Sequence, residues 1–486
     1  MLKTDVGLYA AFKAKDARFD GRFFVGVSST GIYCRPVCRA KLPKAENCSF
    51  YETAAAAERA GFRPCLLCRP ELAPGAGPVD AALSLARRAA RMLEEGCGSE
   101  QSIGEIASRL GYTERHLRRA FVAEYHVSPI HYLQTCKLLL AKNLLTDTDL
   151  SVIEVALAAG FGSLRRFNDL FKKRYRLAPT TLRKQVAIAK GKGGGVTLAL
   201  GYRPPYSWRN MIDFLALRAI PGVELVKDGE YLRTIRLTTV ENRRLSGWIR
   251  IGHQPEGGLL RVTIDSTLLP VLPQVLGKVR HLFDLYCNPD VVYEALESMN
   301  RIRPNLCVPG VRIPGCFDSF EMAVRAILGQ QITVRGARTL ASRIVHEFGT
   351  PVHTGVEGLT HVFPSPEEIA SLDGPIAGHL GPLGVTGKRA GTIQEVARAL
   401  AHGDIDLAPG ADPEVGLAKL LRIPGIGPWT AHYIAMRAIG WTDAFPHTDY
   451  GVRKALEPRT GKEILMLSEA WRPWRSYATI SLWSSL

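Results

Sequence analysis

Two short sequences, YCRPVCR at residues 33–39 and RPCLLCR at residues 63–69, each carry a close pair of cysteines. The four cysteines are Cys34, Cys38, Cys65 and Cys68. Two close pairs on separate turns supply the four sulfur ligands that a tetrahedral zinc ion takes. The sequence therefore predicts a small domain over residues 1–75 that is stapled by metal, because so short a segment has little hydrophobic core.

The residues around the cysteines bear on what this zinc site does. Most sites built only from cysteine hold a domain together, so a purely structural role is one interpretation. The flanking arginines favour another, because a site of four thiolates is anionic and a basic surround indicates that it faces a polyanion. These arginines are Arg35, Arg39, Arg63 and Arg69.

Positive charge is concentrated in the same half of the chain. The net charge is +16, and residues 1–195 hold 31 Lys+Arg against 18 Asp+Glu, which leaves +13 in this half and +3 in the other. A strongly basic half favours a nucleic-acid partner. The start of the chain has no apolar signal core, and no stretch approaches the roughly 18 apolar residues of a membrane span. We therefore expect a cytoplasmic protein with no membrane partner.

Residues 79–184 contain two similar helical units. The first runs from SIGEIA at 102–107 through a turn at Gly111, and the second from SVIEVA at 151–156 through a turn at Gly160. Each unit starts with a serine that has a glutamate three residues later, which is the pattern of a capping box. The doubled unit predicts paired helix-turn-helix motifs, although a plain helical bundle is the alternative.

Beyond a basic, glycine-rich linker at 185–195 the composition changes. Residues 196–300 alternate β-rich segments with helices expected near 208–219 and 270–286, which indicates an α+β domain. Residues 301–486 return to helices separated by proline and glycine turns. A further breaker cluster, PGAGP at 74–78, predicts a linker after the cysteine domain.

The helical C-terminal part carries a tight turn, LRIPGIGPWTA at residues 421–431. Backbone N–H groups at Gly425 and Gly427, at the start of a helix, are suited to a DNA phosphate, although a plain helix connection has the same sequence. Asp449 follows in the segment FPHTDY. A lone aspartate is usually a helix cap, and that is the alternative to a catalytic role.

The cysteine segment resembles the N-terminal domain of Ada, the family of bacterial adaptive-response methyltransferases, over residues 5–72. The resemblance implies one zinc ion, with Cys34 as both ligand and methyl acceptor and the other three cysteines as spectator ligands. It implies irreversible methyl transfer from DNA methylphosphotriesters, which removes a negative charge and converts the protein into a transcriptional activator. The Pro-Cys-His-Arg motif of Ada's usual C-terminal methyltransferase is absent, so repair of O6-alkylguanine is not expected.

The paired units, with their glycine turns and aromatic spacing, resemble the AraC-type DNA-binding domain. This resemblance implies recognition helices that begin near Thr113 and Ser163. The candidate contacts to bases or phosphates are Arg115, Arg118, Arg119, Arg165 and Arg166. Each of these arginines has a solvated surface charge as its alternative reading.

Residues 197–486 resemble the helix-hairpin-helix DNA glycosylases, and among them the AlkA alkylbase glycosylases. The resemblance implies that a damaged nucleotide is flipped out and that Asp449 stabilises the oxocarbenium-like sugar. Trp429 stands where strand-cleaving relatives carry a lysine, so we expect hydrolysis without strand cleavage. The implied base pocket comprises Trp429, Tyr433, Tyr450 and Trp483, whose alternative is ordinary core. The family's leucine wedge corresponds to Gln331 here, which makes the wedge role a departure from the pattern.

These patterns predict a multidomain α+β protein with four domains. They are a small zinc-bound α/β methyl-acceptor domain (1–75), an all-α double helix-turn-helix domain (79–184), an α+β glycosylase N-domain (196–300) and an all-α helix-hairpin-helix domain (301–486). We expect a monomer that binds double-stranded DNA at alkylated lesions and promoter sites, with RNA polymerase as the partner of its activator form. Two rivals remain: a methyl-sensing regulator whose glycosylase fold only binds DNA, and a glycosylase whose zinc domain only positions it.

Overall fold

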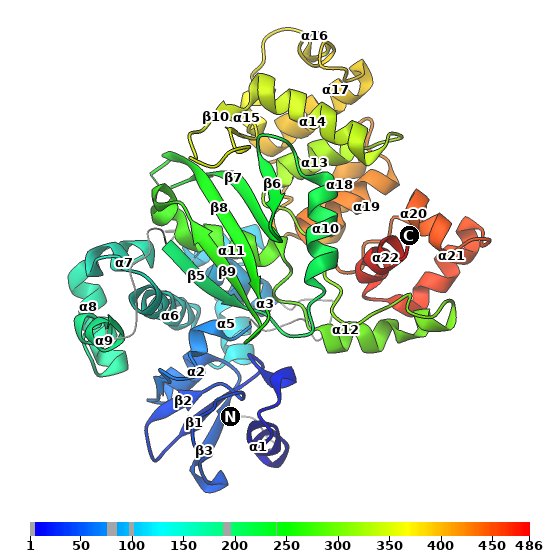
Figure 1. Ribbon diagram of the computed structural model, residues 1–486. Helices are drawn as coiled ribbons and strands as arrows, with labels where there is room; N and C mark the ends of the chain where they lie inside the picture. The colour runs from blue at the N-terminus through cyan, green and yellow to red at the C-terminus, as the bar shows by residue number, and fades with distance from the viewer. Residues whose placement is uncertain (1–4, 75–84, 97–101, 188–195, 240) are drawn as a thin grey trace.

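The computed structural model describes residues 5–74, 85–96, 102–187, 196–239 and 241–486 (Figure 1). Most of the predicted linker at 74–78 and residues 188–195 of the second linker lie outside the described residues. Among the described residues, no helix is both long enough and apolar enough to cross a membrane.

A four-stranded sheet in the order β3–β1–β2–β4 organises the N-terminal domain, blue in Figure 1. Its elements are α1 (Asp5–Lys13), β1 (Phe24–Val27), β2 (Ile32–Cys34), β3 (Cys48–Tyr51), α2 (Ala54–Arg59) and β4 (Arg63–Pro64). Strand β4 runs parallel to β2, with Tyr33 opposite Pro64. This pairing brings the ends of β2 and β4 side by side, so Cys34 and Cys65 meet although they are distant in sequence.

The next part is helical, and both predicted helix-turn-helix units are present. The helices are α3 (Leu85–Glu95), α4 (Ile103–Arg109), α5 (Glu114–Tyr125), α6 (Pro129–Asp147), α7 (Val152–Ala158), α8 (Leu164–Tyr175) and α9 (Pro179–Ala187). Both predicted capping boxes form, at Ser102 and Ser151. The turns at Gly111 and Gly160 each adopt a φ of 81°, a left-handed conformation that favours glycine. Helix α6 joins the two units.

An antiparallel sheet in the order β5–β9–β8–β7–β6 forms the third part. Its elements are β5 (Val196–Gly201), α10 (Trp208–Arg218), β6 (Glu224–Lys227), β7 (Glu230–Thr238), β8 (Arg244–Gln254), β9 (Leu259–Ile264) and α11 (Leu272–Leu282). Helices α10 and α11 confirm the two helices expected from the sequence. Side chains of β5 alternate between buried and half-buried, as a sheet covered on one face requires.

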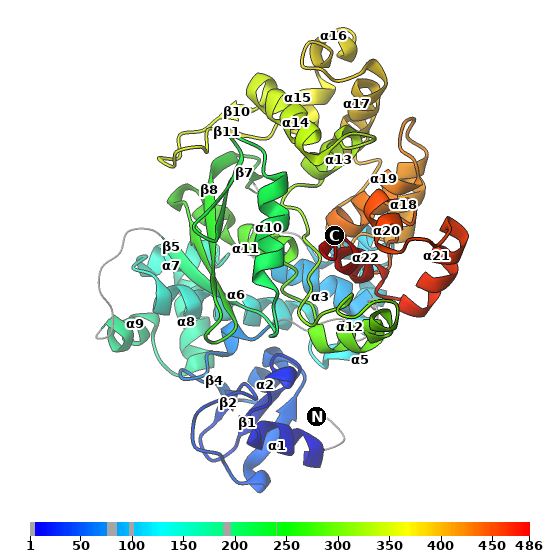
Figure 2. The same ribbon diagram turned by 45° about the vertical axis from the view of Figure 1, so that its right-hand side comes forward.

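The last part is a bundle of helices around its own hydrophobic core. Its helices are α12 (Pro289–Leu296), α13 (Ser319–Leu328), α14 (Val334–Phe348), α15 (Pro366–Ala370), α16 (Ile376–Leu380), α17 (Gly387–Ala401), α18 (Pro413–Leu421), α19 (Pro428–Ile434), α20 (Tyr450–Ala455), α21 (Gly461–Ser468) and α22 (Arg475–Ser484). A π-helical turn, Ala435–Ile439, follows α19, and one short strand pair joins β10 (Thr350–Pro351) to β11 (His361–Val362). Figure 2 shows α19, α20 and α22 grouped together.

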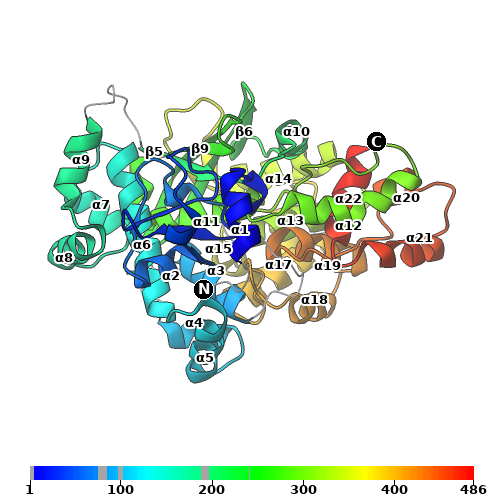
Figure 3. The same cartoon turned by 90° about the horizontal axis from the view of Figure 1, so that it is seen from below.

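The second helix-turn-helix unit and the large sheet share one hydrophobic core. Leu138 and Phe167 from the helices belong to the same buried cluster as Leu198 and Ile249 from the sheet. Figures 1 and 3 both show α6 and α7 beside β5. The two halves of the chain are therefore packed directly on each other, in addition to being joined by the linker.

The cysteine domain is in turn docked on α6. The Lys142 ammonium, buried in α6, donates to the Glu71 carboxylate at 2.5 Å and to the Cys65 carbonyl at 3.4 Å. Arg69 donates to Asn143 and Asp147, each at 2.8 Å. These contacts attach a cysteine-bearing loop to the helix that joins the two helix-turn-helix units.

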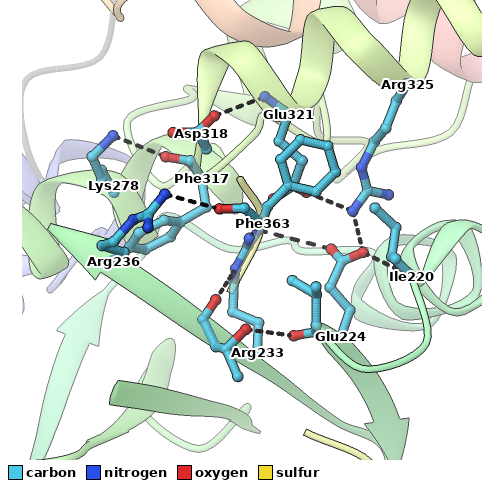
Figure 4. Close-up of polar contacts among 12 residues, drawn as sticks. Ile220, Glu224, Arg233, Arg236, Lys278, Phe317, Asp318, Glu321, Arg325 and Phe363 are labelled. Carbon is cyan, nitrogen blue, oxygen red and sulfur yellow. Dashed lines mark hydrogen bonds and ion pairs between the residues drawn. The ribbon is translucent and has the colours of Figure 1, made fainter. Parts of the chain in front are cut away.

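A buried network of four charges joins the large sheet to the helical bundle (Figure 4). Arg233 of β7 pairs with Glu321 of α13 at 2.7 Å, while Arg325 of α13 pairs with both Glu321 and Glu224 of β6. Burial raises the pKa of Glu224, but Arg325 and Arg233 outweigh it and hold this pKa below its ordinary value. Removing one member would leave an uncompensated buried charge, which is strongly destabilising. Arg325 also donates to the carbonyl of Arg218 at 2.8 Å, so the network secures the end of α10.

Candidate metal centre and base pocket

The four predicted cysteine ligands converge on one point. Their Sγ atoms all lie within 4.8 Å of one another, and a tetrahedral zinc site with Zn–S bonds of about 2.3 Å needs sulfurs about 3.8 Å apart. Cys34, Cys38 and Cys65 are buried and Cys68 is half-buried. The sulfur-only donor set and its compact arrangement fit one zinc ion.

The arginines beside the cysteines are not all arranged as the sequence predicted. The backbone N–H of Arg35 donates to the Cys68 sulfur at 3.3 Å, while its guanidinium is buried and paired with Asp20. Arg69 pairs with Glu71 and Asp147. The prediction of a basic surround that faces a polyanion is therefore wrong for Arg35 and Arg69, because internal carboxylates neutralise both charges.

The predicted recognition helices start where the sequence indicated. Thr113 caps α5 and Ser163 caps α8. Arg115, Arg119, Arg165 and Arg166 are exposed on these helices, whereas Arg118 is half-buried and donates to Glu114 at 2.7 Å. Four of the five arginines therefore present their side chains to solvent, and their contacts with DNA stay a prediction.

The glycine turn at 421–431 lies between α18 and α19, as predicted. Gly425 has a φ of 92°, and a Cβ there would meet Thr392 Oγ1 at 2.1 Å, so only glycine fits. Thr392 Oγ1 donates to the Pro424 carbonyl at 2.9 Å, and Gln330 Nε2 donates to the Gly425 carbonyl at 3.0 Å. The turn is thus held through its carbonyls, while Gly427 is exposed at the start of α19.

Gln331 lies immediately after this support. Gln330 holds the hairpin and also donates to Thr430 Oγ1 at 3.0 Å, and the next residue, Gln331, is exposed with a φ of 55°. The predicted wedge therefore projects close to the predicted phosphate-binding turn. Its insertion into DNA stays a prediction.

Asp449 is a helix cap and is also held by two tryptophans. Its Oδ1 accepts from the backbone N–H of Val452 at 3.1 Å and from Trp483 Nε1 at 2.7 Å, while its Oδ2 accepts from Trp429 Nε1 at 2.8 Å. The helix-cap reading is correct but incomplete. Two indole N–H groups, one for each oxygen, orient this carboxylate beside an aromatic cluster.

Three of the four predicted pocket aromatics come together. The rings of Trp429 and Tyr433 are parallel, with centroids 5.3 Å apart, and Trp483 lies 6.0 Å from Tyr433. Tyr450 is 77% exposed, and the contact described for its ring is with the Lys454 ammonium at 5.8 Å. The structure does not bring Tyr450 to the other three, so its place in the pocket stays a prediction.

Four family models match successive parts of the chain. The metal binding domain of Ada matches residues 7–71, and a helix-turn-helix domain matches 86–185. The AlkA N-terminal domain matches 197–318, and the HhH-GPD superfamily of base excision DNA repair proteins matches 324–459. Their order along the chain is the order that the sequence motifs predicted.

Curated proteins match both the whole chain and its halves. The probable bifunctional transcriptional activator/DNA repair enzyme AlkA of Mycobacterium tuberculosis H37Rv is 38% identical over 98% of this chain and 96% of its own. The chain belongs to this AlkA family of bifunctional activator/repair proteins. DNA-3-methyladenine glycosylase 2 of Escherichia coli is 37% identical over 58% of this chain and 95% of its own. The bifunctional enzyme Ada of Escherichia coli is 32% identical over 41% of this chain and 52% of its own.

Sequence reasoning missed three side chains beside the aromatic cluster of this AlkA-family chain. Phe214 of α10 stacks against Trp483 with centroids 6.3 Å apart, and Arg218 of α10 lies 3.7 Å from the Phe214 ring. Arg437 donates to the Tyr433 hydroxyl at 2.9 Å. A signal for Arg437 was present, since it lies four residues after Tyr433 and residues four apart on a helix are neighbours. No local pattern in the sequence predicts that α10 packs against α19.

Proposed function

We propose that this chain repairs alkylated DNA in two ways and regulates transcription in response to the damage. Cys34 takes a methyl group irreversibly from a DNA methylphosphotriester, and its sulfur becomes a thioether. The bound zinc ion keeps the four thiols deprotonated and thus nucleophilic at neutral pH. Cys38, Cys65 and Cys68 serve as spectator ligands, and the convergence of the four sulfurs supports this assignment.

Methylation of Cys34 turns the protein into a transcriptional activator. It lowers the negative charge of the four-sulfur site by one. Its repulsion of a single DNA phosphate at a distance of roughly 6 Å then falls by about 3 kcal/mol. The exposed arginines of α5 and α8 bind the promoter. The docking of the cysteine domain on α6 supports a shared DNA-binding surface. Contact with RNA polymerase, a monomeric state and a cytoplasmic location belong to this proposal.

The second activity hydrolyses the N-glycosidic bond of alkylated purines such as 3-methyladenine. The observation that carries it is the Asp449 carboxylate, held by the indoles of Trp429 and Trp483. A fixed carboxylate stabilises positive charge that develops on the sugar, and the aromatic rings stack on a cationic base. Gly425, Gly427 and Gln331 hold the DNA around the flipped nucleotide. Without a lysine at Trp429, the enzyme leaves the strand uncut.

The test uses duplex DNA that carries labelled methyl groups, with wild type, Cys34→Ala, Asp449→Asn and Cys48→Ala. Cys48 is the matched control, because it lies in the same domain outside the sulfur cluster. We expect label on wild type and Cys48→Ala but not on Cys34→Ala, and released methylpurine from every protein except Asp449→Asn.

The two rivals give different results in this experiment. An unlabelled wild-type protein that still releases methylpurine would reduce the zinc site to a positioning domain. A labelled protein that releases no methylpurine would leave a methyl-sensing regulator whose glycosylase fold only binds DNA.

A further inference from the structure

The two recognition helices have the same length and the same packing. Helices α5 and α8 each contain 12 residues, and each is followed by a residue in the left-handed conformation, His126 with a φ of 56° and Arg176 with a φ of 57°. Their buried side chains stand at equivalent positions, Leu117, Phe121 and Tyr125 in α5 and Phe167, Phe171 and Tyr175 in α8. The two helices can therefore be compared position by position.

Three exposed cations extend along the C-terminal half of α8, and we call them the α8 strip. They are Lys172, Lys173 and Arg176. In the part of the chain that the structure describes, no carboxylate forms an ion pair with any of the three.

The equivalent positions of α5 carry no fixed charge. They are occupied by Val122, Ala123 and His126, all of them exposed. Cations in the last turn of a helix can complement the helix dipole. Because α5 forms the same helix without any basic residue in its last turn, the α8 strip is not required for the helix to form.

The end of α8 adjoins the predicted metal centre. Helix α8 contacts β4, and Tyr175 lines a small cavity together with Leu66. Leu66 is 45% exposed and stands between the ligands Cys65 and Cys68 in the chain. Figure 2 shows β4 directly below α8. The α8 strip therefore leads to the helix end that contacts the loop with two of the four sulfurs.

The end of α5 adjoins the other edge of the same sheet. Tyr125 and His126 line a cavity with Tyr51 of β3 and Arg59 of α2. Strands β3 and β4 are the two edge strands of the four-stranded sheet. The two recognition helices thus reach opposite edges of the cysteine domain, and only the helix that reaches the zinc ligands carries a run of exposed cations in its C-terminal half.

Electrostatics requires positive charge near this metal centre. Four thiolates outweigh the charge of a zinc ion, so the site repels the DNA backbone. A methylphosphotriester is itself uncharged, and the attraction that holds it must come from the phosphates on either side. Arg35 and Arg69 cannot supply that attraction, because internal carboxylates neutralise both. The unpaired cations of the α8 strip can bind the neighbouring phosphates.

We propose that the α8 strip holds the DNA backbone for methyl transfer, with Lys172, Lys173 and Arg176 bound to phosphates beside the methylphosphotriester. The inference rests on the methyl transfer proposed above, and it gives α8 a substrate-binding role in addition to promoter binding. In the transfer, an S–C bond forms at Cys34 and the methyl C–O bond breaks, leaving its electron pair on the phosphate oxygen. The product is an ordinary phosphodiester anion, whose new charge the strip also attracts.

The experiment measures the rate at which zinc-loaded, full-length protein takes the methyl group from duplex DNA with one labelled methylphosphotriester. The main variant, Lys172→Gln/Lys173→Gln, removes two exposed charges. Each phosphate contact that is lost lowers the slope of log affinity against log salt by about one. We expect the variant to react about tenfold more slowly at low DNA concentration, with a salt slope shallower by about two. At saturating DNA it should react at the wild-type rate, because Cys34 is unchanged.

Two matched variants test whether the position of the charges matters. Lys227→Gln/Arg261→Gln removes two exposed charges from the large sheet and should leave the rate unchanged. Val122→Lys/Ala123→Lys, added to the main variant, places two lysines at the equivalent positions of α5 and should not restore the rate. Thermal melting and zinc content verify that each variant is folded and loaded.

The outcomes separate this inference from the proposed function. Wild type that acquires no label overturns the methyl transfer and the inference with it. A main variant that reacts at the wild-type rate at every salt concentration overturns the inference and leaves the methyl transfer standing. The same conclusion follows if the variant stays equally slow at saturating DNA, or if the lysines on α5 restore its rate in full.

Discussion

The four sulfurs of the metal centre come from residues 34–68, whereas the aromatic cluster that we propose as the base pocket joins side chains from Phe214 to Trp483. The sulfurs meet through one strand pairing, β2 with β4, and they are close enough together to bind a single zinc ion. The pocket needs α10, α19 and α22 from two domains, and hydrogen bonds, ring contacts and buried ion pairs hold it together. A site held by metal can thus be local, while a site held by many weak contacts depends on the whole scaffold.

The largest effect is expected from a variant that disrupts the metal centre. Structural zinc contributes about 10–16 kcal/mol to small zinc-dependent folds, which is comparable to or more than the whole stability of most domains. We therefore expect Cys38→Ala to unfold residues 5–74, while the large sheet and bundle stay folded on their own cores. Hydrogen exchange and zinc content measure this, with Cys48→Ala as the control. Slow exchange in β1 and β2 of a zinc-free Cys38→Ala protein would contradict it.

The next effect concerns Glu58, where the cysteine domain meets α6. Its oxygens accept from the hydroxyls of Tyr33 at 3.1 Å and Thr135 at 3.0 Å. Burial raises the pKa of Glu58 from 4.5 to about 7. Because the folded state holds the extra proton, this contribution to stability is full below about pH 4.5 and is lost as the pH rises through 7.

Glu58→Gln removes this titration while an amide keeps the hydrogen bonds. Between pH 4.5 and pH 7, wild type should lose about 3 kcal/mol of unfolding free energy relative to the variant. Urea unfolding of both proteins across this range measures the difference. The exposed Glu46→Gln is the matched control. A constant difference between wild type and Glu58→Gln at all pH values would show that the pKa of Glu58 is the same in the folded and unfolded states, which would contradict this prediction.

A third variant tests how hydrogen bonds hold the Asp449 carboxylate in the aromatic cluster. Trp483→Phe keeps an aromatic ring but removes the N–H that donates to Asp449. A hydrogen bond to a charged group contributes about 1.5–3 kcal/mol, so methylpurine release should fall about tenfold to a hundredfold. Trp429→Phe should behave alike, and Trp441→Phe, whose ring stacks on His432 instead, is the control. Unchanged release by Trp483→Phe would mean that this ring serves only for stacking.

The smallest effect concerns an ion pair between the two halves of the chain. Arg109 of the first helix-turn-helix unit pairs with Asp406 of the bundle at 2.8 Å, with side chains 39% and 42% exposed. Exposed ion pairs contribute about 0.2–1 kcal/mol and weaken with salt. A double-mutant cycle of Arg109→Ala and Asp406→Ala, measured by denaturation at low and high salt, should give a coupling in this range. A coupling above about 2 kcal/mol would indicate that this pair, rather than the shared core, joins the halves.

Local signals predicted many features well. The capping boxes at Ser102 and Ser151 form because a hydroxyl and a carboxylate three residues apart satisfy the free N–H groups of a helix start. The turn at Gly425 was predictable because it needs a φ of 92°, a backbone conformation that glycine adopts readily and other residues rarely do. The burial of Arg35 against Asp20 was not predictable, since a charged side chain carries no local sign of its partner.

The sequence by itself determined the cysteine quartet, the doubled helical unit, the hairpin and Asp449, because each depends on residue type at short spacing. Only the tertiary structure decided that Trp429 and Trp483 share the Asp449 carboxylate, and that Arg437 donates to the Tyr433 hydroxyl. It also decided that the helix-turn-helix helices and the large sheet share one core. Such contacts join residues far apart in the chain, and the packing of whole helices and sheets sets them rather than any local pattern.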